Sequence, residues 1–424
     1  MSAEVKVGYK QSEVGVIPED WYQSTIGELS IKVGSGITPR GGNSNYKDYG
    51  RPFVRSQNVG WGNLRLDDLV YIEEETHNCF ASTELKEADV LLNITGASIG
   101  RSALVDKRLV GGNVNQHVCV IRVNQTASLP GYINYFLLSV FGQAQIDSFQ
   151  AGGNREGLNF GQIKSIKLSL PANKAEQEAI LEALSDADAL IDSLEQLITK
   201  KRHIKQGAMQ ELLTGKKRLP GFSGEWEVVK AEDIGRFRGG SGFPSQFQGV
   251  TDAEFPFFKV SDMNNVDNET FMETANNYIS ETQRKQLGAT AFPMKSIVIA
   301  KVGAAIFLER KRILDKPSCL DNNMAAFTFD LARANCRFIH YLFLNMRFGD
   351  LVSTTALPSL SGNVLSAIEL VLPSFDEQTA ITEILSDMDS EIDAMEVKLV
   401  KIRQIKKGMM YNLLTGKIRL ILIR

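Results

Sequence analysis

The sequence is poor in cysteine, and the cysteines that it has are not paired. Four stand far apart in 424 residues, and no Cys-x-x-Cys pair occurs. The spacing excludes a disulfide framework and a zinc knuckle, and we expect reduced thiols in a cytosolic protein. An excess of positive charge is also missing, because 47 Lys and Arg residues face 50 Asp and Glu residues. A uniformly basic coat for nucleic acid is therefore excluded, whereas a local basic face is not.

Long hydrophobic runs are absent too. The longest apolar stretch, residues 296–308, carries Lys301 and is too short to span a bilayer. We interpret it as a buried strand or a pair of strands. The first ten residues have no apolar core of the signal-peptide kind. We therefore expect a cytoplasmic protein without a membrane partner.

The motifs of common catalytic sites are not found. No two prolines are adjacent, which excludes the Asp/Asn-Pro-Pro-aromatic loop of amino-methyltransferases. No G-x-G-x-x-G segment follows a strand, and neither Gly215 nor Gly416 has the earlier glycine of a phosphate-binding loop. The four histidines lack metal-ligand spacing, although His117 could touch a ligand. Acidic pairs such as Asp67-Asp68 are typical of solvated loops. We expect no catalytic residue, no metal site and no cofactor on this chain.

What the sequence does contain is a duplication. Glu176-Gln177, Leu184-Ser185-Asp186 and Leu212-Leu213-Thr214-Gly215-Lys216 all recur 201 residues later, and more than half of the positions from 176 to 216 are identical in the two copies. Weaker matches extend upstream at offsets of 201 to 207. They pair Trp21 with Trp226, Gly34-Ser35-Gly36 with Gly240-Ser241-Gly242, Asn115-Gln116 with Asn322-Asn323, and Leu170-Pro171 with Leu372-Pro373. The whole chain is thus a tandem repeat.

Each copy divides into a variable globular part and a closely repeated helix. We place the globular parts at residues 1–171 and 218–373 and the helices at 172–217 and 374–424. Apolar residues in each helix step alternately by four and three, which is the seam of a coiled coil. The seam positions are Ile180, Leu184, Ala187, Ile191, Leu194 and Ile198, repeated at Ile381, Leu385, Met388, Ile392, Met395 and Leu399. Acidic residues gather in the first half of each helix and basic residues in the second, so we expect antiparallel pairing.

The globular parts show a mixed pattern. Residues 90–94, 118–122 and 297–300 predict strands, and residues 132–141 and 338–348 predict short amphipathic helices. The predicted fold class is therefore α+β, with two mixed α/β globular domains that each lead into a long helix.

The sequence lacks catalytic motifs, but it contains several loops rich in Gly, Asn, Gln and Arg. Arginine reads guanine and Asn or Gln reads adenine in the major groove, while glycine allows backbone to approach phosphates. Any one of these loops alone is more simply an ordinary polar turn. The candidate DNA-binding residues are Arg40, Asn43, Arg55, Gln57, Asn58, Asn115, Gln116 and Arg155 in the first half, and Arg238, Lys259, Lys301, Arg310, Asn322 and Asn323 in the second.

These features together resemble a known family. Ile17-Pro18-Glu19-Asp20-Trp21 at the entry, Leu-Pro before each helix, Glu-Gln at each helix start and Leu-Leu-Thr-Gly-Lys at each helix end are similar to the specificity subunit of type I restriction–modification enzymes. The resemblance covers nearly the whole chain. The C-terminus departs from the family pattern, since Ile421-Leu422-Ile423-Arg424 replaces the Pro-Gly-Phe that follows the first copy. The sequence therefore does not decide whether the C-terminal segment packs against the first domain.

The resemblance implies two target recognition domains that bind the two parts of a split, asymmetric site in double-stranded DNA. It also implies partners, namely two modification subunits and restriction subunits, on which S-adenosylmethionine, ATP and Mg²⁺ would be bound. Two other functions stay open. One is a self-contained restriction or modification enzyme with an unrecognised catalytic site, and the other is a coiled-coil scaffold that does not bind DNA.

Overall fold

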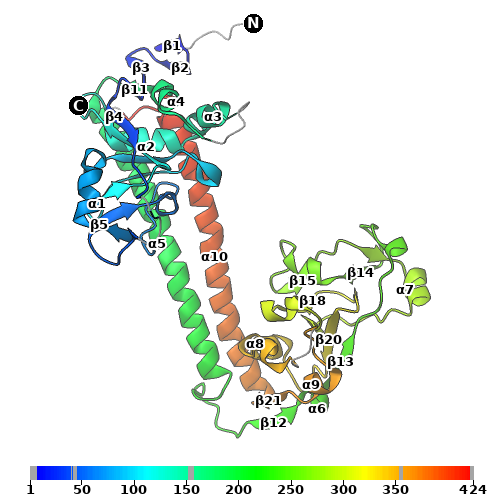
Figure 1. The fold of residues 1–424 in the computed structure, drawn as a ribbon. Helices are drawn as coiled ribbons and strands as arrows, with labels where there is room; N and C mark the ends of the chain where they lie inside the picture. Colours follow the sequence, from blue (N-terminus) through cyan, green and yellow to red (C-terminus); the bar gives the residue numbers. More distant parts are fainter. Residues whose placement is uncertain (1–6, 40, 42–44, 151–156, 353–356, 421–424) are drawn as a thin grey trace. The chain divides into compact units, whose positions relative to one another are not determined.

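The computed structural model describes residues 7–39, 41, 45–150, 157–352 and 357–420. The chain folds into two compact units, one of residues 1–195 and 397–424 and the other of residues 196–396. Each unit combines a globular part with one segment of each long helix (Figure 1). We call residues 7–171 the first head and residues 218–373 the second head.

The first head contains short strands and four helices before its long helix. Its strands are β1 (Tyr9–Ser12), β2 (Gly15–Pro18), β3 (Trp21–Thr25), β4 (Ser30–Ser35), β5 (Arg51–Val54), β6 (Val70–Ile72), β7 (Val90–Asn93), β8 (Ser102–Leu104), β9 (Asn113–Val114), β10 (Val118–Val123) and β11 (Lys167–Pro171). Its helices are α1 (Glu74–Cys79), α2 (Pro130–Leu138), α3 (Val140–Ser148) and α4 (Phe160–Ser165), and the long helix α5 spans Lys174–Leu212. Short 3₁₀ turns are η2 (Ser56–Asn58), η3 (Ala81–Thr83) and η4 (Gly96–Ser98).

The second head repeats this order. Its strands are β12 (Glu227–Lys230), β13 (Gly235–Gly239), β14 (Phe255–Phe258), β15 (Phe271–Met272), β16 (Tyr278–Ile279), β17 (Ile297–Ala300), β18 (Lys311–Leu314), β19 (Cys319–Leu320), β20 (Met324–Phe329) and β21 (Glu369–Leu372). Its helices are α6 (Ala231–Ile234), α7 (Glu281–Leu287), α8 (Cys336–Asn345) and α9 (Gly362–Ser366), followed by α10 (Phe375–Leu413). Its 3₁₀ turns are η5 (Ser245–Phe247), η6 (Val260–Asn264), η7 (Ala304–Leu308) and η8 (Phe348–Leu351).

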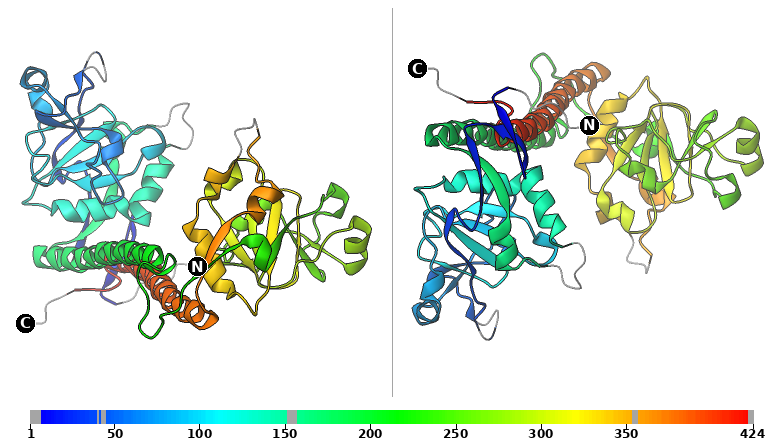
Figure 2. Two further views of the ribbon diagram at one scale, coloured as in Figure 1. Left: turned by 90° about the horizontal axis from the view of Figure 1, so that it is seen from below. Right: turned by 90° about the horizontal axis from the view of Figure 1, so that it is seen from above.

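A central sheet separates two layers in each head. The strand orders are β4-β10-β7-β8 and β13-β20-β17-β18-β15. Because successive side chains of a strand point to opposite faces, Ile297 and Ile299 of β17 join the core under α8 and α10, whereas Val298 joins the core of the β14 layer. Figure 2 shows α8 and the start of α10 on one side of these strands and the β14–β16 layer on the other. The predicted α+β class is confirmed.

The two long helices pair antiparallel within each unit. The acidic first half of each helix contacts the basic second half of the other, as their charge pattern predicts. Equivalent ion pairs offset by 201 residues join Lys406 to Asp188 and Arg403 to Glu195 in unit 1, and Lys205 to Asp389 and Arg202 to Glu396 in unit 2.

The predicted seam does not serve only the pairing of the helices. Its positions are buried or half-buried, but Ile180 and Leu184 belong to the core of the first head. Ile381 and Leu385 belong in the same way to the core of the second head. The first two positions of each seam therefore attach a helix to its head, because the head covers the start of that helix before the partner helix does.

Each unit is closed by a buried carboxylate, and the two carboxylates occupy equivalent positions of the repeat. Glu176 is 4% exposed and accepts hydrogen bonds from Trp21 Nε1 at 3.3 Å and from Arg419 Nε and Nη2 at 2.5 and 2.8 Å. Glu377 accepts equivalent bonds from Trp226 Nε1 at 3.2 Å and from Arg218 at 2.7 and 2.7 Å. The C-terminal segment thus does close onto the first head, because Arg419 precedes the residues at which the two copies differ.

The neighbouring glutamines have a related role. Gln177 accepts from the backbone N–H of Leu129 at 3.2 Å and donates to the carbonyl of Pro171 at 3.0 Å. Gln378 makes the same contacts with Asn335 and Pro373 at 2.8 and 3.0 Å. The repeated Glu-Gln motif therefore ties the head, the helix start and the Leu-Pro strand end together.

Three predicted segments are confirmed only in part. The helix expected at 338–348 ends at Asn345. The helix expected at 132–141 ends at Leu138, and a new helix starts at Val140 because Ser139 turns extended and its hydroxyl caps Gly142 N–H at 3.3 Å. The apolar stretch 296–308 supplies only one buried strand, β17, because Gly303 adopts a left-handed φ of 80° and starts the 3₁₀ turn η7. Phe307 and Leu308 of that turn are exposed rather than buried.

Candidate nucleic-acid interface

The candidate residues of each head gather where several strands end together. In the first head, Asn115 N–H donates to Val54 O at the end of β5, and the Asn115 side chain accepts from His117 N–H at 3.1 Å. In the second head, Asp321 N–H donates to Phe258 O, and the Asp321 side chain accepts from Asn323 N–H at 3.0 Å. Both turns precede the central strand, β10 or β20. We call this edge of each head, where β5 or β14 ends and β10 or β20 begins, the loop edge.

This geometry corrects the alignment made from sequence. Asn115 corresponds to Asp321 and Gln116 to Asn322, one residue away from the sequence match of Asn115-Gln116 with Asn322-Asn323. The glycine match shifts as well, because Gly36 and Gly240 are the equivalent pair. A side chain at Gly36 would overlap the carbonyl of Val114, and one at Gly240 would overlap the carbonyls of Leu320 and Asp321. Glycine is needed there for close backbone approach.

The exits of β7 and β17 lie at the same edge. Ile94 N–H donates to His117 O at 3.0 Å, and Lys301 N–H donates to Asn323 O at 2.8 Å. Lys301 therefore lies beside the Asn322-Asn323 turn, and its ammonium also approaches Gly239 at the end of β13. Gln116 and Asn322 are exposed at the two turn tips, where a ligand can reach them.

Three candidates of the first head converge on one acid. The guanidinium of Arg55 donates to Asp68 O at 2.6 Å, and the amides of Gln57 and Asn58 donate to the Asp68 carboxylate, that of Asn58 at 2.8 Å. Asp68 is an exposed loop charge, as the sequence indicated, and it also anchors these three side chains. Asn58 is fully buried and also bonds Arg55 N–H and Arg65 O, so it shapes the loop and does not face a ligand. Arg55 and Gln57 remain candidates, held in place by Asp68.

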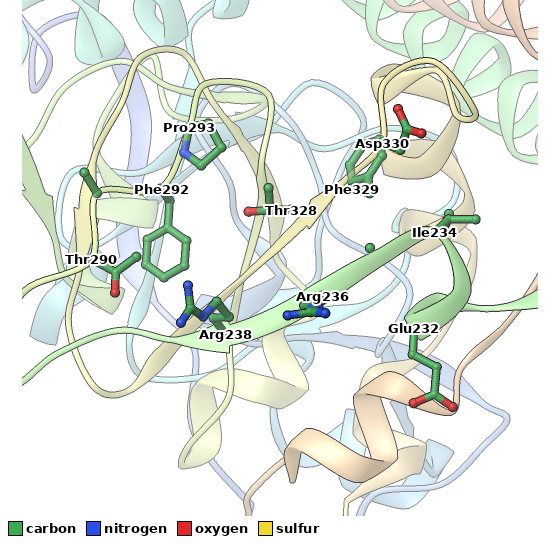
Figure 3. A pocket seen from close by; sticks show the side chains of 12 residues that line it. Glu232, Ile234, Arg236, Arg238, Thr290, Phe292, Pro293, Thr328, Phe329 and Asp330 are labelled. Atoms are coloured by element: carbon green, nitrogen blue, oxygen red, sulfur yellow. The ribbon is translucent and has the colours of Figure 1, made fainter.

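Cations of the second head line the edge strand β13. Arg236 and Arg238 are exposed on one face of the strand, while Phe237 between them stacks on Phe327 at 4.5 Å. Figure 3 shows both guanidinium groups at a pocket of about 380 Å³ that Phe292 and Thr328 also line. Within the described residues neither guanidinium has an ion pair. Arg236 and Arg238 share this face because residues two apart on a strand point to the same side.

The other candidates are distributed as follows. Lys259 follows β14, and its ammonium donates to Gln248 Oε1 at 3.3 Å. Arg310 contacts the Asn264 side chain near the start of β18. Arg40, Asn43 and Arg155 lie outside the described residues.

The two heads differ in charge at equivalent buried positions. Asn58 and Asn115 of the first head correspond to Asp262 and Asp321 of the second. Burial raises the pKa of both carboxyl groups, against the lowering effect of backbone hydrogen bonds and of Lys259. The second head therefore carries carboxylates that are costly to ionise where the first carries neutral amides.

Replacing Asp321 by asparagine is expected to stabilise the second head at neutral pH. Folding raises the pKa of this carboxyl group, so its ionised form stabilises the folded state less than its protonated form does. The free energy of unfolding of the wild type therefore falls as pH rises from the ordinary to the raised pKa. Asn115 shows that asparagine makes the same turn. The melting temperature of D321N minus that of wild type should be near zero below the ordinary carboxyl pKa and positive above the raised one. A difference that stays constant with pH would contradict the assignment.

Among the described residues, no group of three or more His, Cys, Asp and Glu side chains is arranged to hold a metal ion. Within the same residues, no helix combines the length and the apolar character needed to cross a membrane.

Comparisons with known proteins agree with this arrangement. The family model described as "Type I restriction modification DNA specificity domain" matches residues 18–202 and again residues 223–404. A putative type I restriction enzyme MjaX specificity subunit from Methanocaldococcus jannaschii is 24% identical, over 97% of this chain and 96% of the relative. The MjaVIII specificity subunit of the same organism is 25% identical, over 79% and 80%.

Two solved structures share the fold. One, from work on complex assembly and conformational transition of the type I restriction–modification system, has a TM-score of 0.60 and 15% identity, covering 95% of this chain and 99% of that one. The S subunit from M. genitalium has a TM-score of 0.55 and 16% identity, covering 93% and 96%.

Proposed function

Since the chain belongs to the type I restriction–modification DNA specificity family, we propose that its two heads read the two parts of a bipartite, asymmetric DNA site for partner subunits that methylate and cleave DNA. The observation that carries the proposal is the pair of equivalent loop edges with different side chains. The backbone frame of the turns is the same, whereas Gln116 stands where the second head has Asn322, and Arg55 where it has Lys259. Such edges suit two different half-sites.

The partners that we propose are double-stranded DNA, two modification subunits and restriction subunits. S-adenosylmethionine, ATP and Mg²⁺ would be bound by those subunits, and this chain would act without a catalytic residue of its own. The proposal that DNA is a partner rests on the polar and cationic side chains exposed at the loop edges, such as Gln116, Asn322 and Arg238.

The proposal is tested by mapping methylated bases in DNA from cells that express the chain together with the modification subunit. The expected result is one motif of two short defined parts separated by a spacer of unspecified sequence. Exchanging residues 218–373 for the second head of another specificity subunit should change one part only. A continuous motif, or changes in both parts, would contradict the proposal.

The purified chain alone separates the two other functions. A self-contained enzyme predicts cleavage with Mg²⁺ or methyl transfer with S-adenosylmethionine, and we expect neither. A scaffold without a DNA role predicts no salt-dependent DNA binding even with partner subunits present, whereas contacts to phosphates make binding fall as salt rises.

The turn tips provide a matched pair of substitutions. Asn322→Ala is expected to weaken binding by about 1–3 kcal/mol and to relax the choice of one base pair in the second half-site, because a bidentate amide contact is lost. Gln116→Ala should do the same in the first half-site alone. Binding measured against a panel of single-base variants of the site checks both, and unchanged preference in both variants would remove the turn tips from the interface.

A further inference from the structure

The loop that follows β17 in the second head is longer than the equivalent loop that follows β7 in the first head. Both versions open with a left-handed glycine, Gly96 at φ 67° or Gly303 at φ 80°, and pass through a 3₁₀ turn. Both close with a second left-handed residue, Gly100 at φ 85° or Glu309 at φ 55°. Four steps separate these positions in the first head and six in the second. The two additional residues are Phe307 and Leu308.

These two side chains are presented to solvent. Phe307 is 55% exposed and Leu308 is 57% exposed. Burying large apolar side chains is favourable, so two adjacent ones at a loop tip mark a contact surface more often than single ones do. We call Phe307 and Leu308 the apolar tip.

The apolar tip is held by an ion pair between the half-buried Glu309 and the buried Lys311. The Glu309 carboxylate accepts from the backbone N–H groups of Phe348 and Gly349 at 3.0 and 2.8 Å and pairs with Lys311. Lys311 is almost fully buried, donates to Met346 O at 3.0 Å and lies over the Phe348 ring at 4.8 Å. A non-glycine residue in the left-handed region is strained, and contacts of this kind hold it there. The loop is therefore fixed on η8.

The surroundings of the tip are polar and cationic. Lys301 precedes the loop at the Asn322-Asn323 turn, and Arg310 follows it. Arg347 at the start of η8 has a side chain that is 79% exposed. An apolar tip with cations on the neighbouring segments complements DNA, because cations contact phosphates while an apolar side chain can enter a base step and unstack it.

We propose that the apolar tip is a wedge that enters one base step of the second half-site. The proposal rests on DNA recognition by the second head and adds to it a specificity element that the first head lacks. A wedge favours steps that unstack easily, such as pyrimidine–purine steps, so the tip selects sequence through deformability as well as through base edges.

The test uses the full chain and duplexes of the mapped site in which 2-aminopurine replaces each adenine of the second half-site and its flanks in turn. Wild type is expected to raise the fluorescence at one step. The double variant Phe307→Ala, Leu308→Ala should abolish this rise and weaken binding about tenfold, which corresponds to about 1.4 kcal/mol. Deleting residues 307 and 308, which restores the loop length of the first head, should act alike. In Phe307→Trp, the indole emission should be quenched on binding.

Met294→Ala is the matched control, because Met294 is 50% exposed in the same head but lies before the start of β17, at its opposite end. It should bind and unstack like wild type. Specific binding without a fluorescence rise, or a rise that the double variant keeps, overturns the wedge alone. If the double variant unstacks DNA normally but no longer assembles with modification subunits, the tip is a protein contact and the proposal is also overturned. Absence of sequence-specific binding by wild type overturns the proposed function, and the wedge with it.

Discussion

Replacing Glu176 by alanine is expected to lower the free energy of unfolding of unit 1 by about 3–5 kcal/mol, the range found when one partner of a buried ion pair is removed. The carboxylate is 4% exposed and accepts hydrogen bonds from Arg419 and Trp21, which lie at opposite ends of the chain. Its loss leaves the Arg419 guanidinium without its buried partner and opens the contact between the C-terminal segment and the first head. Hydrogen exchange should show faster exchange in residues 7–39 and 397–420.

Glu377→Ala is the matched control, since Glu377 bonds Arg218 and Trp226 in unit 2 by the same geometry. It should increase exchange in the second head and leave the first protected. Arg419→Ala should weaken unit 1 at least as much as Glu176→Ala does, because it leaves the buried Glu176 carboxylate without its ion-pair partner, whereas Arg419 is partly exposed and keeps Asp20 when Glu176 is lost. If Glu176→Ala changed neither unit, the buried carboxylate would not be what closes unit 1.

Lengthening both long helices by seven residues is expected to change the spacing of the DNA site without changing its defined parts. The chain passes between the units at 195/196 and 396/397, inside α5 and α10. Insertion of one heptad at both points keeps every ion pair between the helices within its own unit. One heptad adds about 10.5 Å at about 1.5 Å per residue, equivalent to about three base pairs at roughly 34–36 Å per turn of about 10–10.5 base pairs. Methylation mapping should reveal a spacer that is one to three base pairs longer.

Insertion into α5 alone is the control. The two helices then differ in length, so one set of pairs, such as Arg403 with Glu195 or Arg202 with Glu396, must lose its register. This variant should be less stable than the doubly lengthened one. A double insertion that kept the parental spacer and altered the bases read would show that the helices do not set the spacing.

The sequence alone was sufficient to predict the elements that the duplication repeats closely. The apolar seams predicted the long helices and the acidic and basic halves predicted their antiparallel pairing, because helical periodicity and charge are local properties. It did not reveal that Glu176 and Glu377 are closing residues, since their partners lie up to 243 positions away. The strands at 90–93, 118–123 and 297–300 were also predicted, because runs of buried apolar residues carry that signal.

The loop edges were predicted less well. Asn58 has the composition of a base reader, but its burial depends on Asp68 and on a turn that composition does not determine. The match of Asn115 was one residue off because the equivalence is set by backbone hydrogen bonds to β5 and β14, not by residue type. Phe307 was missed because an apolar run looks the same whether it continues a strand or leaves it at a left-handed glycine.

The arrangement of the two units also sets an order of completion during synthesis. Unit 2 is one continuous segment, so all of it is synthesised before residues 397–420 are. The first head is made first, yet Arg419 and the rest of its C-terminal segment follow only after the 201 residues of unit 2. At about 5–20 residues per second, this delay is roughly 10–40 s. The head that begins the chain is thus the last to be finished, and a premature stop after residue 396 would damage the N-terminal half of the protein while sparing the middle.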